Sequence, residues 1–208
     1  MTQSLPKGER MKIVLTGGPS AGKTSLAEVL TRTYSEQINI VPEAASMLFA
    51  GGFPRRDQPR HVECQQRAIY YVQRELERSI GYDSGDRTLI CDRGSLDALA
   101  YWPGNEPDFF ASIESTMEAE IARYQWVMHL ETASPHDYKV SSIRTENVVE
   151  AERLNNRVKQ AWRLHPQRII IPNSSDFPTK IHAAIQIVRG ILEHRSADEI
   201  RHLLQRGA

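Results

Sequence analysis

Short apolar runs alternate along the chain with longer stretches in which apolar residues recur every three or four positions. The short runs are typical of strands that are buried on both faces. They predict strands at residues 11–16, 38–41, 87–92, 125–132 and 168–172. Because strands that alternate with helices are joined by crossover connections, we expect an α/β fold, a doubly wound five-stranded parallel sheet.

The stretches between the strands have the period of amphipathic helices. At residues 61–80, for example, Ile69, Val72 and Leu76 fall on one helical face. Further helices are predicted after the first glycine-rich turn and at residues 95–101, 109–123, 148–162 and 179–194. The residues just after each strand are the informative ones, because doubly wound sheets bind ligands at the carboxyl ends of their strands.

The length of 208 residues is that of one domain. We expect a loose polar arm at residues 1–10, the α/β domain at residues 11–195, and a closing helix at residues 196–208. Ser196 is the expected N-cap of that last helix.

Charge and cysteine content narrow the functional classes. Lys plus Arg and Asp plus Glu each number 26, so the formal net charge is zero, which disfavours a nucleic-acid binder. Cys64 and Cys91 form no CxxC pattern, so no disulfide framework or structural zinc site is expected. No apolar run approaches the roughly 18–20 residues that span a bilayer, and we expect a cytoplasmic protein without membrane contact.

A glycine-rich loop directly follows the first predicted strand. It matches the pattern G-x-x-x-x-G-K-[ST], in which backbone N–H groups cradle phosphates and the helix N-terminus faces the anion. A glycine-rich turn without a ligand is the alternative. The pattern predicts ATP and Mg²⁺ as cofactors, with Lys23 at the terminal phosphates and Thr24 on the metal. The nucleotide-binding residues are then Gly17, Gly18, Pro19, Ser20, Ala21, Gly22, Lys23, Thr24 and Ser25.

The third predicted strand ends in an acid, Asp92. A carboxylate at that place can hold Mg²⁺ or accept the proton of an attacking hydroxyl. The alternative is a helix N-cap, since Gly94 and Ser95 follow.

Three short motifs together resemble the P-loop kinases of nucleosides and nucleotides. They are the loop GGPSAGKT, Glu43 in VPEAA, and Asp92-Arg93-Gly94 in LICDRG. Within those kinases the chain is most similar to the ribosylnicotinamide-kinase-like group, which is often labelled as AAA-domain ATP-binding proteins. Residues 53–55 and the helix QQRAIYYVQRELE at residues 65–77 also look like that group, and the resemblance covers roughly residues 11–194.

The resemblance implies a P-loop kinase-like fold and roles for the strand-end residues. Glu43 would act near the acceptor hydroxyl, while Asp92 and Arg93 would hold metal and phosphate. The alternatives are a surface acid at a strand end for Glu43 and a structural salt bridge for Arg93.

Residues 133–162 lie where such kinases carry a helical lid. A guanidinium delivered by a lid would stabilise the charge of the transferring phosphoryl group. Arg153 and Arg157 are four residues apart, so they share one face if the helix is continuous. The alternative to a catalytic role is that these arginines form a solvated charged face. The candidate lid residues are Arg144, Arg153 and Arg157.

Adenine and acceptor contacts are expected from two further segments. The loop after the fifth strand falls where these folds hold adenine, with Asn173 as a candidate contact. The acceptor side should come from residues 53–78, where Gln66 and Gln73 lie two helical turns apart and can line one groove. An ordinary turn and an exposed helix surface are the respective alternatives. The polar acceptor candidates are Arg55, Gln66, Arg67 and Gln73.

Three functions are compatible with these features. The leading one is Mg·ATP-dependent phosphoryl transfer to a small hydroxyl-bearing acceptor, for which the family resemblance suggests a nucleoside such as ribosylnicotinamide. The alternatives are a P-loop ATPase or regulatory switch, and a non-catalytic ATP-binding module. The absence of an NKxD motif disfavours a GTP switch. ATP and a small molecule are the expected partners, and a homodimer is one oligomeric state left open.

Overall fold

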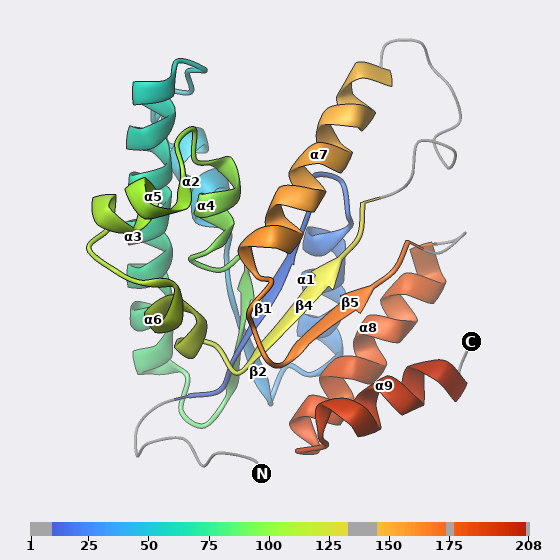
Figure 1. Ribbon diagram of the computed structural model, residues 1–208. Helices are drawn as coiled ribbons and strands as arrows, with labels where there is room; N and C mark the ends of the chain where they lie inside the picture. The colour runs from blue at the N-terminus through green and yellow to red at the C-terminus, as the bar shows by residue number, and fades with distance from the viewer. Residues whose placement is uncertain (1–9, 133–144, 174–176, 207–208) are drawn as a thin grey trace.

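The computed structural model describes residues 10–132, 145–173 and 177–206. Within these residues the strands form a five-stranded, all-parallel sheet in the order β2–β3–β1–β4–β5, with helices on both faces (Figure 1). This confirms the predicted doubly wound architecture. The strands are β1 (Lys12–Gly17), β2 (Ile38–Val41), β3 (Thr88–Asp92), β4 (Trp126–Leu130) and β5 (Arg168–Ile171).

The central strand β1 extends further toward the carboxyl edge of the sheet than its neighbour β3. Leu15 of β1 lies opposite Asp92, the last residue of β3, while Gly17 lies opposite Leu130 at the end of β4. The strand order reverses at β1, because β3 and β2 lie on one side of it and β4 and β5 on the other. Such a switch point is where open α/β sheets bind ligands.

Alternate residues of β1 face two separate cores. Ile13 and Leu15 pack with α1 (Lys23–Thr33), α8 (Phe177–Leu192) and α9 (Ala197–Arg206). Val14 points the other way. The helices over the second face are α3 (Pro59–Asp83), α4 (Asp97–Tyr101), α6 (Met117–Ala122) and α7 (Thr145–Ala161). Both faces of the sheet are therefore covered by helices, as the apolar strand pattern predicts.

The structure differs from the predicted helices in two places. A short helix, α2 (Ala44–Ala50), follows β2. The single helix expected at residues 109–123 is two helices, α5 (Glu106–Ser112) and α6. The physical reason is local capping: Asn105 accepts the N–H of Asp108, and Thr116 accepts the N–H of Ala119, so each helix has its own N-terminus.

Ser196 caps α9 as predicted. Its hydroxyl accepts the N–H of Glu199 at 3.3 Å, and the Glu199 carboxylate accepts the N–H of Ser196 at 2.8 Å, which is a reciprocal capping box. Most of the arm predicted at residues 1–10 lies outside the described residues. In the described part of the chain, no helix is both long enough and apolar enough to cross a membrane.

Candidate active site

The glycine-rich loop joins β1 to α1 at the carboxyl edge of the sheet. Gly17 and Gly22 have φ values of +138° and +91°, a region that favours glycine. A Cβ on Gly17 would lie 2.1 Å from the carbonyl oxygen of Leu130, and one on Gly22 would lie 2.3 Å from the Phe177 ring. The two invariant glycines of the pattern are thus required both for backbone conformation and for close packing against β4 and α8.

Lys23 begins α1 and folds back over the loop. Its Nζ donates to the carbonyl oxygens of Gly17 at 3.2 Å and Gly18 at 2.9 Å, and the residue is 8% exposed. Burial, with a smaller contribution from the nearby Arg93 charge, lowers the pKa of Lys23 to about 8. An ammonium has three hydrogens, so one remains for a further acceptor such as a phosphate oxygen. Thr24 and Ser25 follow in the first turn and are exposed.

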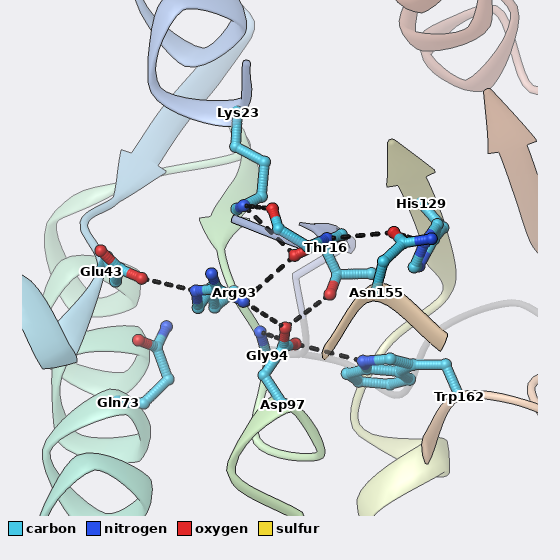
Figure 2. A network of polar contacts seen from close by, with 12 residues as sticks. Thr16, Lys23, Glu43, Gln73, Arg93, Gly94, Asp97, His129, Asn155 and Trp162 are labelled. Atoms are coloured by element: carbon cyan, nitrogen blue, oxygen red, sulfur yellow. Dashed lines mark hydrogen bonds and ion pairs between the residues drawn. The ribbon is translucent and has the colours of Figure 1, made fainter. Parts of the chain in front are cut away.

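Arg93, directly after β3, bridges Glu43 and the loop. Its Nε donates to Glu43 Oε1 at 2.5 Å, and its Nη1 donates to Asp97 Oδ1 at 3.0 Å and to Gly17 O at 3.3 Å (Figure 2). The residue adopts a φ of +73°, which is strained for a side chain with a Cβ. Tight bonding on several sides holds it there.

Asp97, in the first turn of α4, organises this centre and was missed by the sequence analysis. Its side chain is buried, at 3% exposed. It accepts hydrogen bonds from Thr16 Oγ1 (2.5 Å), Arg93 Nη1 (3.0 Å), Gly94 N (3.0 Å) and Trp162 Nε1 (3.1 Å). Asp97 accepts the Gly94 N–H from within α4, whose N-cap is Leu96, so the helix-capping role considered for Asp92 is wrong.

Asp92 and Glu43 have pKa values shifted in opposite directions. Burial raises the pKa of Asp92 to about 6, although the Lys23 charge opposes that shift. Its Oδ1 is buried and has no hydrogen-bond partner in the described structure. Burial also acts to raise the pKa of Glu43, but Arg93 and the Ser46 hydroxyl outweigh it, and the net shift is downward.

Beside Glu43 lies a cavity of about 600 Å³ between α2, α3 and α4. Of the predicted acceptor residues, Arg55, Gln66 and Gln73 line it. Arg67 does not line it, and instead lies 3.5 Å from Cys64 Sγ on the same helix. A cavity of this size is in the range of small-molecule sites.

Gln73 presents an unused donor at this cavity. Its Oε1 accepts the N–H of Ala44 at 3.3 Å, which fixes the orientation of the amide. Its Nε2 is buried without a partner among the described residues, and Figure 2 places the amide beside Glu43 and Arg93. The side chain can therefore donate to an oxygen or ring nitrogen of a bound molecule.

The two described lid arginines, Arg153 and Arg157, are not gathered at this site. Arg153 is exposed and pairs with Glu150 at 2.9 Å on the surface of α7. Arg157 Nη2 donates to the carbonyl oxygen of Trp102 at 2.7 Å. Arg144, like the rest of residues 133–144, lies outside the described residues. The two described arginines share one helix but have separate partners.

Asn173, the adenine candidate, follows β5, and its backbone hydrogen-bonds to the Glu131 carboxylate. The Phe177 ring lies close to the loop at Gly22. Asn155 of α7 is a further contact that sequence reasoning missed: its Oδ1 accepts the N–H of Gly18 at 3.2 Å.

Residues Thr24 and Asp92 were predicted to hold Mg²⁺. The buried, unpartnered Oδ1 of Asp92 and the hydroxyl of Thr24 are hard oxygen ligands, which fits this ion. Within the described residues, no group of three or more His, Cys, Asp or Glu side chains could hold a metal by itself. Mg²⁺ commonly completes its shell with substrate phosphates and water, so the donor set fits an ion that arrives with a nucleotide.

Comparisons with known proteins agree with the fold. A family model described as an AAA domain matches residues 12–180. Among solved structures, thymidylate kinase from Ehrlichia chaffeensis is similar with a TM-score of 0.57 and 14% identity, over 87% of this chain and 99% of that one. Deoxyadenosine kinase from M. mycoides, solved with bound dATP, is similar with a TM-score of 0.55 and 14% identity, over 86% of this chain and 100% of that one. No curated protein matches the chain in sequence.

Proposed function

The chain belongs to the AAA-domain family, and from the geometry of its site we propose that it transfers the γ-phosphoryl group of Mg·ATP to a small hydroxyl-bearing acceptor. The observation that carries the proposal is the junction of two features at one sheet edge. Arg93 contacts the phosphate-loop carbonyl of Gly17 on one side and Glu43, in the wall of the cavity, on the other. The γ-phosphate of ATP and the hydroxyl group of the acceptor molecule would meet beside this arginine.

The donor side rests on residues 17–24. Backbone N–H groups of the loop and the start of α1 would bind the phosphates, and Lys23 would contact the terminal ones. Mg²⁺, held by Thr24 and Asp92, would neutralise charge on the phosphates. Asn173 and the neighbouring loop would contact the base, although residues 174–176 lie outside the described part of the chain.

On the acceptor side, Glu43 is the better-placed base. It lines the cavity, whereas Asp92 does not. In the transfer, the acceptor oxygen bonds to the γ-phosphorus, the bond to the bridging oxygen of ATP breaks, and the hydroxyl proton passes to Glu43. The lowered pKa of Glu43 makes it a weak base. Phosphoryl transfer tolerates this, because its loose transition state needs little activation of the nucleophile.

A nucleoside is the acceptor class that we propose. The two similar structures bear the names of a thymidylate and a deoxyadenosine kinase, and the unused Nε2 of Gln73 suits a carbonyl oxygen or ring nitrogen of a base. Ribosylnicotinamide, suggested by the motif resemblance, carries such a carbonyl in its amide. The lid role of residues 133–162 belongs to this proposal, and Arg157 would have to leave the Trp102 carbonyl to reach the phosphates.

The test is a thermal-shift screen of nucleosides, nucleotides and small polyols in the presence of Mg²⁺ and a non-hydrolysable ATP analogue. A ligand at 100 times its Kd adds about 2.7 kcal/mol of stability, which such a screen detects. Hits are then assayed with Mg·ATP for a phosphorylated product. ATP binding with hydrolysis but no acceptor would favour an ATPase or switch, and binding without any turnover would favour a non-catalytic module.

A further inference from the structure

The first turn of the phosphate loop is held by side chains from outside the loop. Asn155 Oδ1 on α7 accepts the N–H of Gly18 at 3.2 Å, and Thr132 Oγ1, two residues after β4, donates to the carbonyl oxygen of Pro19 at 3.3 Å. Figure 2 shows the Asn155 side chain between the loop and His129, with a hydrogen bond to each. These contacts span more than a hundred residues of sequence.

The Asn155 amide has only one orientation available. An N–H can be accepted only by oxygen, so Oδ1 must face Gly18. The same oxygen lies 2.9 Å from His129 Nε2, which must then carry the hydrogen. His129 is fully buried and Asn155 is 6% exposed, so neither side chain can easily turn to water instead. The His129 ring therefore holds the Asn155 side chain in place, and Asn155 in turn holds the Gly18 N–H of the phosphate loop.

Position 18 requires a glycine because Thr132 and α7 pack directly against its backbone. A Cβ there would lie 2.2 Å from Thr132 Oγ1 and 2.8 Å from Asn155 Cβ. Its φ lies outside the region reserved for glycine, so space rather than backbone conformation requires a glycine here. The loop and α7 therefore form one packed unit at this point.

A single peptide group joins this contact to the reacting centre. The peptide between Gly17 and Gly18 donates its N–H to Asn155, while its carbonyl oxygen accepts from Lys23 Nζ and Arg93 Nη1. The N–H and C=O of one peptide are rigidly coplanar and opposed. Holding the N–H therefore aims the carbonyl at both cations.

We propose that Asn155 is a positioning residue for nucleotide binding: it sets the plane of the Gly17–Gly18 peptide and thereby places Lys23 and the phosphate loop. Adjacent glycines have the largest backbone freedom of any residues, so an unanchored peptide would sample other planes before each binding event. Anchoring it beforehand removes that cost from the binding step. The inference rests on the proposed function in one respect, namely that the loop binds a nucleotide.

The test compares Asn155→Leu, which keeps the branched shape but removes the acceptor oxygen, with Asn155→Asp, which keeps that oxygen. Asn155→Ala is measured alongside in case leucine disrupts folding. Asn156→Leu, at the exposed next position on α7, is the matched control. Two quantities are measured on the full chain: hydrogen exchange of the Gly18 amide by NMR without nucleotide, and the Kd of Mg·ADP by calorimetry.

We expect Asn155→Leu and Asn155→Ala to speed exchange at Gly18 and to weaken Mg·ADP binding about tenfold, as for loss of one buried hydrogen bond. Asn155→Asp should restore slow exchange, and Asn156→Leu should match the wild type in both measurements. Unchanged exchange and Kd in a folded Asn155→Leu or Asn155→Ala would overturn the inference. So would an Asn155→Asp variant whose Gly18 exchanges as fast as in Asn155→Leu.

Failure of the proposed function gives a different result. In that case neither the wild type nor Asn156→Leu binds Mg·ADP, while exchange at Gly18 still reports whether Asn155 holds the peptide. A nucleotide-binding wild type with unaffected Asn155 variants would instead leave the proposed function intact and remove the positioning role.

Discussion

Two buried networks of acids and cations lie at opposite ends of the central strands, and they are built differently. At the amino edge, Glu77 accepts from Lys12 Nζ at 3.0 Å, Arg123 Nη2 at 2.9 Å and the Tyr124 hydroxyl at 2.7 Å. Its side chain is completely buried. At the carboxyl edge, Asp97 holds Arg93, which in turn holds Glu43.

The difference lies in what each network leaves unused. Both oxygens of Glu77 accept hydrogen bonds. The buried Arg123 Nε and Glu120 Oε2 make no hydrogen bond among the described residues, but they form an ion pair with each other at 3.4 Å, so neither charge awaits a ligand. The carboxyl edge instead has a strained Arg93, an unpartnered oxygen on Asp92 and an unpartnered amide nitrogen on Gln73, as far as the described residues show. Unused buried polar groups cost stability, and a fold retains them where a ligand supplies the missing partner. The comparison therefore predicts that the amino edge stabilises the fold and the carboxyl edge performs the chemistry.

The sharpest test of this contrast uses one lysine from each edge: Lys23 at the start of α1 and Lys12 at the start of β1. Lys23→Ala should lower phosphoryl transfer by about a thousandfold or more, because it removes a charge that stabilises the transferring group. Lys12→Ala, at the amino edge, should keep the transfer rate of the folded enzyme. Transfer rates with the acceptor found by screening, together with circular dichroism, measure both. Full turnover in a folded Lys23→Ala protein would contradict the phosphate-loop assignment.

The converse substitution tests the amino edge. Glu77→Ala should lower the free energy of unfolding by about 3 kcal/mol, because it leaves a buried tyrosine hydroxyl and two cations without their shared acceptor. The Kd of Mg·ADP should stay at the wild-type value in the folded fraction. Urea unfolding and calorimetry measure these two quantities. A changed Kd with unchanged stability would reverse the roles that we assign to the two edges.

Within the carboxyl edge, substitutions of Glu43 and Asp92 should affect different steps of the reaction. Glu43→Gln should keep Mg·ATP affinity and lower single-turnover transfer by about a hundredfold, the lower end of the range for a general base, since Arg93 already keeps this carboxylate weakly basic. Asp92→Asn should weaken Mg·ATP binding as well as the rate. If Glu43→Gln transfers at full rate while Asp92→Asn loses only chemistry, Asp92 is the base.

The smallest expected effect is a pH dependence of stability that comes from His129, one of two buried histidines. His165, near the amino edge, uses both ring nitrogens, whereas His129 Nδ1 has no partner in the described structure. Burial lowers the pKa of His129 to about 4, despite the opposing Asn155 hydrogen bond. An unfolded histidine titrates near 6.5, so the unfolded state binds the proton first as the pH falls, and stability declines below about pH 6.5.

Between pH 7 and pH 5 the His129 contribution should amount to about 2 kcal/mol. The raised pKa of Asp92 acts in the opposite direction, because there the folded state takes up the proton first. The contribution is therefore measured as the difference between the wild type and His129→Gln in urea unfolding at several pH values. Parallel pH profiles for the two proteins would show that His129 is not buried as a neutral imidazole.

Much of the frame of the site follows from local sequence. Residues 17–24 match a pattern whose glycines are needed for backbone conformations at Gly17 and Gly22, and the structure has both. The helix period also placed Gln66 and Gln73 along one groove, and both line the cavity. The same period grouped Arg153 with Arg157, yet their partners, Glu150 and the Trp102 carbonyl, differ.

The sequence by itself determined the alternation of strands and helices, the phosphate loop and the strand-end acids, because these depend on periodicity and on backbone conformations of neighbouring residues. Only the tertiary structure decided that Asp97 orients Arg93 and that Asn155 holds Gly18. The hydrogen bond from Gly18 to Asn155 joins residues 137 positions apart. No local pattern distinguishes Asn155 from its exposed neighbour Asn156, because the difference is which face of α7 packs against the loop, and that is set by the whole sheet.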